Sequence, residues 1–102
     1  MKTPGFTICD NKGFHITFEN GWTVSVQFGG GNYCDNYDSK IGSEHDSRGM
    51  TSGNAEVAYW PPDGKMQRFR TSGDTVAGRY TPRQVLNLLK KVAAKPKART
   101  AK

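Results

Sequence analysis

Three consecutive glycines followed by polar and aromatic residues form the first segment of this 102-residue sequence that could do chemistry. The run 29–35 (GGGNYCD) comes directly after an alternating, strand-like segment, as phosphate-binding loops do. No Lys-Ser/Thr pair and no helical pattern follow, so the spacing differs from that of the nucleotide-binding motifs. We interpret the run either as a strand exit that needs glycine backbone angles or as a ligand contact. The binding candidates here are Asn32, Tyr33, Asp35 and Tyr37.

The two cysteines and two histidines are widely separated along the chain. Cys34 could act as a nucleophile with His15 or His45 as its base, since a thiol needs a neighbouring base to ionise. The carboxylates of Asp35 and Asp38 disfavour a thiolate there. Together, the Cys and His side chains lack the short paired spacings of a structural zinc site. We therefore expect no enzyme activity, no metal site and no cofactor.

Acidic and amide side chains are concentrated in the long irregular segment 29–53, which contains half of the twelve glycines. The residues are Asn32, Asp35, Asn36, Asp38, Glu44 and Asp46. They lack the regular alternation ending in Glu that marks a calcium loop. We interpret the segment as a solvated surface loop, or as a negative surface that attracts a basic site on a protein partner.

An aromatic residue and two arginines flank a turn later in the chain. The sequence PPDG at 61–64 predicts a hairpin between 55–60 and 65–70. In the expected register, Trp60, Arg68 and Arg70 share one face of this hairpin. Such a face either stacks on bases and contacts phosphates of a nucleic acid, or is an amphipathic face exposed to solvent.

The net charge of +6 is concentrated at one end of the sequence. Residues 1–82 contain eight Lys/Arg and nine Asp/Glu, whereas residues 83–102 contain seven Lys/Arg and no acidic residue. Residues 95–102 have no apolar pattern and predict a disordered basic tail. The tail either contacts phosphates with salt-sensitive affinity or adds solubility.

Alternating apolar and polar residues predict the strands that position these groups. The segments 14–18 and 22–28 have the period of two expected of half-buried strands. A three-residue loop with a left-handed Gly21 aligns their apolar residues on one face, whereas a two-residue turn does not. Residues 6–9 predict a preceding strand, and 75–80 a short extended stretch.

A helix is predicted after Thr81, which can cap it, with Pro82 in its first turn and Gln84 at the spacing of a capping box. Its apolar residues recur at helical spacing and are Val85, Leu86, Leu88, Leu89 and Val92. The expected fold is α+β: an antiparallel sheet of about five strands, with two hairpins, packed on this C-terminal helix. One domain, 1–94, then contains the Gly-rich loop 29–53 and precedes the tail.

The run 13–35 (GFHITFENGWTVSVQFGGGNYCD) resembles small, uncharacterised accessory proteins of tailed bacteriophages. The later pieces 54–58 (NAEVA) and 80–86 (YTPRQVL) are similar to the same family, so the resemblance spans most of residues 13–93. It implies expression inside an infected bacterium, where such a protein binds and redirects host or defence components. The resemblance implies no catalytic residues.

Our leading hypothesis is a non-catalytic protein that binds a host or defence-system macromolecule, a protein above all. Its contact surfaces are then the loop 29–53 and the face formed by Trp60 and Arg68. One alternative is nucleic-acid binding through the tail with Arg68 and Arg70. Another is capture of a nucleotide-like small molecule by residues 29–33, across the interface of a homo-oligomer.

The N-terminal sequence MKTPG lacks the apolar stretch of a secretory signal, and no apolar run approaches the roughly 20 residues of a membrane span. We therefore expect a cytoplasmic protein, in the host bacterium if it is encoded by a phage, that has no membrane partner.

Overall fold

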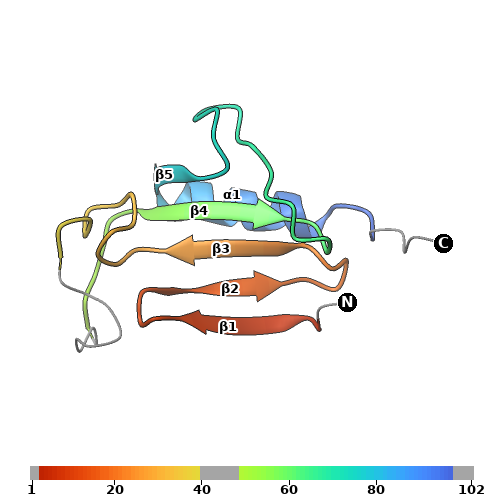
Figure 1. The fold of residues 1–102 in the computed structure, drawn as a ribbon, viewed down its shortest axis with the longest axis horizontal. Helices are drawn as coiled ribbons and strands as arrows, with labels where there is room; N and C mark the ends of the chain where they lie inside the picture. Colours follow the sequence, from red (N-terminus) through yellow and green to blue (C-terminus); the bar gives the residue numbers. More distant parts are fainter. Residues whose placement is uncertain (1–2, 40–48, 98–102) are drawn as a thin grey trace.

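Five strands form one antiparallel sheet, in which the spatial order of the strands follows the chain (Figure 1). The computed structural model describes residues 3–39 and 49–97. The strands are β1 (Gly5–Cys9), β2 (Gly13–Thr17), β3 (Thr23–Gln27), β4 (Ala55–Trp60) and β5 (Ala77–Tyr80), and the helix is α1 (Pro82–Ala93). This is the α+β arrangement that the sequence predicts.

The β2–β3 hairpin has the register that places its apolar residues on one face. Phe14 lies opposite Val26 and Ile16 opposite Val24. The connecting loop adopts a left-handed conformation at Gly21, with φ of 88°, and the Gly21 N–H donates to the Phe18 carbonyl at 2.9 Å. The three-residue loop inferred from the apolar pattern is confirmed.

The expected second hairpin forms its turn but not its second strand. The N–H of Gly64 donates to the carbonyl of Pro61 at 2.9 Å, which closes the PPDG turn. Residues 65–70 are not a strand and give one backbone bond to β4, from the N–H of Gln67 to the carbonyl of Tyr59. The expectation that 65–70 pairs along β4 is therefore wrong.

Burial of Phe69 explains this departure. Its side chain is only 7% exposed and belongs to the core, where it packs edge-to-face on Tyr59 and Tyr80. The Phe69 N–H donates to the carbonyl of Asp74 instead of to β4. β5 takes the neighbouring position in the sheet, with Val57 opposite Ala77.

α1 packs on β3, β4 and β5, whereas β1 and β2 form the part of the sheet that the helix does not cover (Figure 1). Leu88 and Val92 from the helix join Val24, Val26 and Val57 from the sheet in one buried cluster. Burying an aliphatic side chain of this size contributes about 1.5–3 kcal/mol. In residues 3–39 and 49–97, no helix is long and apolar enough to cross a membrane.

Both ends of α1 are anchored by side chains. The hydroxyl of Thr81 accepts a hydrogen bond from the Gln84 N–H, and the Gln84 side chain accepts one from the Thr81 N–H, so the predicted capping box is confirmed. At the other end, the Asn20 amide donates to the carbonyls of Val92 and Lys95, each at 2.9 Å. Asn20 therefore joins the β2–β3 turn to the end of the helix.

Candidate functional site

The glycine run after β3 uses its own backbone groups internally. The Gly29 N–H donates to the side chain of Asn32 at 2.9 Å, and the Asn32 N–H donates back to the Gly29 carbonyl. The N–H of Gly31 donates to the carbonyl of Tyr37. Because the N–H groups of Gly29, Gly31 and Asn32 already have partners within the loop, they are not directed at a ligand as those of a phosphate-binding loop are.

Asn32 is a structural residue of this loop. It is buried, and its amide group donates to the carboxylate of Glu56 on β4 at 3.0 Å. Asn36 is buried as well and donates to the carbonyls of Phe28 and Thr51. Both side chains hold the loop against the end of the sheet, so Asn32 is not directed outward to a ligand.

Cys34 lies inside the same loop. Its side chain is fully buried, and its thiol is 3.7 Å from the carbonyl oxygen of Gly29. His15 packs edge-to-face on Trp60 at a ring distance of 5.1 Å, whereas His45 lies outside the described residues. Within the described ranges, no three His, Cys, Asp or Glu side chains converge as metal ligands. Of the acidic candidates, Glu44 and Asp46 also lie outside those ranges.

The outer side of the loop presents two stacked tyrosines and an ion pair. The rings of Tyr33 and Tyr37 are nearly parallel, with centroids 5.8 Å apart, and the two residues are 52% and 46% exposed. Asp35 accepts a hydrogen bond from the guanidinium of Arg79 at 3.0 Å and another from Asn54. We call Tyr33, Asp35, Tyr37 and Arg79 the loop surface.

Arg79 was not among the residues singled out from the sequence, because its place depends on the contact of β5 with the loop. Its N–H donates to the carbonyl of Tyr33 at 2.9 Å, and its backbone is left-handed, with φ of 54°. The preceding Gly78 makes this approach feasible. A Cβ atom at Gly78 would lie 2.7 Å from the Cβ of Tyr33.

Trp60 and the two arginines do not share a surface. Trp60 packs on His15, on the sheet face opposite α1, whereas the adjacent Tyr59 lines a groove beside α1. Arg68 and Arg70 line that same groove. The face expected to combine Trp60 with Arg68 is therefore not formed, because residues 65–70 do not pair with β4.

The groove beside α1 has a volume of about 590 Å³ and is lined by four cationic side chains. We call it the cationic groove and define it by Arg68, Arg70, Lys91 and Lys95. The described residues that line it include no Asp or Glu. Cations that share a cleft without acidic neighbours create a positive potential that attracts anions.

Aromatic side chains lie among these cations. Tyr59, Phe69 and Tyr80 line the groove and pack on one another edge-to-face, with centroid distances of 5.1 and 5.9 Å. Lys91 lies in the last turn of α1, and Lys95 follows four positions later, just after the helix ends at Ala93. That spacing is the sequence signal that could have added Lys91 and Lys95 to the arginines.

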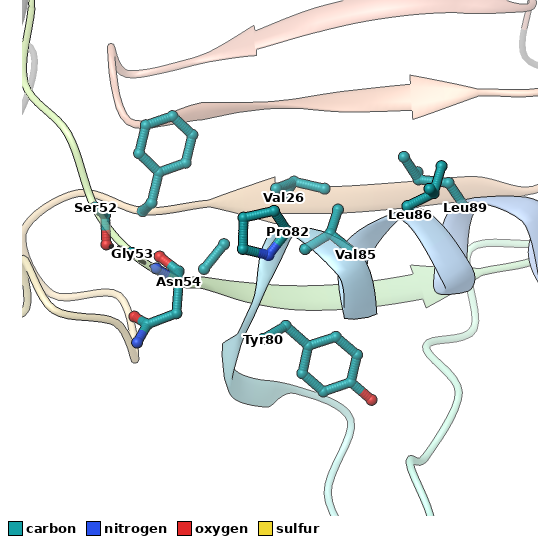
Figure 2. Close-up of a pocket in the computed structure, with 11 residues that line it drawn as sticks. Val26, Ser52, Gly53, Asn54, Tyr80, Pro82, Val85, Leu86 and Leu89 are labelled. Atoms are coloured by element: carbon teal, nitrogen blue, oxygen red, sulfur yellow. Dashed lines mark hydrogen bonds between the residues drawn. The ribbon is translucent and has the colours of Figure 1, made fainter.

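A smaller, apolar pocket of about 310 Å³ lies on the opposite flank of α1. Figure 2 shows Val85, Leu86 and Leu89 of the helix and Val26 of β3 around it, with residues 52–54 along one side. None of its described lining residues is charged. The two flanks of α1 therefore differ in character, one cationic and one apolar.

No protein-family model matches this chain, and no curated protein or solved structure shows significant similarity to it.

Proposed function

We propose that this protein is a non-catalytic binding protein that holds single-stranded nucleic acid in the cationic groove. The observation that carries the proposal is the convergence of four cationic side chains on one groove whose described lining has no acidic residue. Among the surfaces described above, this groove has the largest volume and the strongest charge. Proteins that bind single strands combine a positive groove with aromatic side chains on which bases stack.

The dimensions of the groove are compatible with a few nucleotides. Its helical wall extends from Gln84 to Val92, which corresponds to about 12 Å at the rise of an α-helix. At a spacing of about 3.4 Å per stacked nucleotide, that length accommodates three or four nucleotides. Arg68 and Arg70 contact phosphates from one side and Lys91 from the other, while Tyr80 offers a ring to a base.

The tail is secondary in this proposal. Lys95, where the expected basic tail begins, lies with its ammonium group 4.8 Å from the centre of the Trp22 ring, and its carbonyl accepts from Asn20. This residue is thus part of the folded body and of the groove. The resemblance to phage accessory proteins leads us to propose that the nucleic acid is one present in an infected bacterium.

Fluorescence anisotropy with a labelled oligothymidine of about ten nucleotides tests the proposal. We expect log K to fall with log salt by about 0.7 per phosphate neutralised, so four contacts give a slope of roughly −3. Lys91→Gln weakens binding and lowers the magnitude of the slope. Lys90→Gln is the matched control, because it removes the same charge from the same turn outside the groove.

Two results would contradict the proposal. One is undetectable binding at low salt. The other is an equal loss of affinity in the Lys90→Gln and Lys91→Gln variants, which would trace the interaction to net charge instead of to the groove.

The loop surface favours a second candidate function, binding of a host or defence protein. Exposed tyrosines beside an arginine are typical of interface centres, and here Tyr33 and Tyr37 are already stacked. Capture from a nuclease-treated bacterial lysate tests it. We expect Tyr37→Ser to release the captured protein and Tyr59→Phe, in the cationic groove, to retain it; release by both variants, or by neither, would contradict this candidate.

A further inference from the structure

The β1–β2 hairpin has an apolar face whose β1 side chains are largely exposed in the part of the chain that the structure describes. Phe6 lies opposite Ile16 and Ile8 opposite Phe14, so the four side chains point to one side of the sheet. It is the side on which α1 packs, because Phe14 and Ile16 are in register with the core residues of β3. Yet Phe6 and Ile8 are 77% and 81% exposed. We call these four side chains the apolar ribbon.

Two separate pockets lie on this side of the sheet. One is the pocket of Figure 2, which Phe28 and Leu86 help to line. The other, of about 390 Å³, is lined by Phe6, Ile16 and Ala93 together with polar residues that include Glu19. Leu86 is itself 43% exposed. The helix flank and the ribbon thus both expose apolar side chains, and exposed apolar patches mark interaction sites on proteins.

The charge distribution favours a second copy of the same chain as the occupant. The ten residues of β1 and β2, GFTIC and GFHIT, include no Lys, Arg, Asp or Glu. Two chains that each carry a net charge of +6 can therefore approach through this hairpin without placing like charges against each other.

We propose that two copies of this chain form a dimer in which their apolar ribbons pack face to face across a twofold axis. A twofold contact uses the same patch on both copies, and this patch is apolar throughout, so it complements itself. Sheets pack about 10 Å apart. α1 already occupies that layer above β3–β5, and the hairpin of the second copy fills the same layer beside it.

A stable dimer needs a larger contact area than the ribbon provides, so the contact must include part of the helix. A ribbon of two five-residue strands measures roughly 17 Å by 10 Å, whereas specific interfaces bury about 800 Å² on each partner. The ribbon alone falls short of that area, so the second copy must also cover the two pockets and Leu86. The cationic groove lies on the other flank of α1 and stays open in the dimer. The inference is thus independent of the proposed function.

Analytical ultracentrifugation of the full chain between 1 and 100 µM tests the dimer. We expect a mass of twice the 11.3 kDa of the chain. The double variant Phe6→Ser/Ile8→Ser raises the dimer Kd about 100-fold or more and sediments as a monomer. Circular dichroism shows whether it still folds, which we expect because both side chains are largely exposed within a single chain.

Matched controls separate the ribbon from other contacts. Met66 is also an exposed apolar residue, at 40%, but it lies after the PPDG turn, and Met66→Ser retains the dimer. Thr7 projects from β1 to the opposite face of the sheet, so Thr7→Lys retains the dimer as well.

Two results would overturn the proposal. A wild-type chain that remains monomeric over the whole concentration range would mean that something other than a second copy covers the ribbon. Loss of the dimer in Thr7→Lys together with its retention in Phe6→Ser/Ile8→Ser would mean that the copies pair along the edge of β1 instead of through the ribbon.

Discussion

Asn20 shows how one side chain can join distant parts of this fold. Its amide group donates to carbonyls of residues 72 and 75 positions later in the chain, and its oxygen accepts from the Trp22 N–H. Replacing it with alanine removes one hydrogen bond from each carbonyl, and within the described residues only that of Val92 keeps a further donor, the Lys95 N–H at 3.1 Å. We expect Asn20→Ala to lower the free energy of unfolding by about 1–3 kcal/mol, measured by urea denaturation.

Asn87→Ala is the matched control for this prediction, because Asn87 is exposed on α1 and alanine favours a helix. It should leave the stability unchanged or raise it slightly. Equal destabilisation by the two substitutions would show that the contact of Asn20 with the end of α1 contributes nothing measurable.

Individual residues differ in how far the sequence reveals their roles. Gly21 was predictable because only one loop length aligns the apolar residues of the strands that flank it. Asn32 was expected to contact a ligand, but its side chain is buried and donates a hydrogen bond to Glu56, 24 residues away. Asn20 lies in the predicted three-residue loop before Gly21, which gives no sign of its bonds to the end of α1. The roles of both asparagines depend on partners that are remote in sequence, which composition and periodicity cannot specify.

Among the secondary-structure elements, α1 was the most fully predictable, because its stop and start signals are local. Thr81 and Gln84 bond each other's backbone across three residues. Thr81→Ala should lower the free energy of unfolding by about 1 kcal/mol, measured by urea denaturation. Thr71→Ala, at an exposed position outside any strand or helix, should change it by less than about 0.5 kcal/mol. An effect of Thr81→Ala no larger than that of Thr71→Ala would contradict the assigned cap.

The position of β5 depends on a close approach between backbones. Because a Cβ at residue 78 would meet the Cβ of Tyr33 at 2.7 Å and its carbonyl oxygen at 3.1 Å, Gly78→Ala must push the loop and β5 apart. We expect a loss of about 1–3 kcal/mol in the free energy of unfolding and faster amide exchange at Arg79.

Gly53→Ala is the matched control for Gly78→Ala, since among the described residues a Cβ there meets no backbone atom and only a side-chain oxygen of Asp35, at 3.1 Å. Similar amide exchange at Arg79 in both variants would contradict the close approach.

The contact between Gly78 and Tyr33 also explains why the sequence predicted only a short extended stretch at 75–80, since that contact joins residues far apart in the chain. The alternation at 65–70 is typical of a strand. However, Phe69 is buried in the core and Gly78 contacts Tyr33, so β5 and not 65–70 pairs with β4.

In the whole molecule, α1 divides two surfaces of different chemistry, and the proposals for them can be tested together. A dimer formed through the apolar ribbons carries two cationic grooves, so an oligonucleotide long enough to reach both grooves binds twice within one complex. The second contact is then intramolecular, and linked sites of this kind can gain affinity by a factor of about 10²–10⁴. A ten-nucleotide strand that occupies one groove gains nothing.

We therefore expect the wild-type chain to bind a forty-nucleotide oligothymidine far more tightly than a ten-nucleotide one. The gain in affinity should exceed the few-fold increase that the longer strand has because it offers one groove more positions to bind. The Phe6→Ser/Ile8→Ser variant should bind the short strand as the wild type does and lose most of the advantage of the long one. Anisotropy titrations of both proteins with both strands provide the comparison. The same length dependence in a dimeric wild type and a monomeric variant would mean that the two grooves of a dimer do not share one strand, because their separation or direction prevents it.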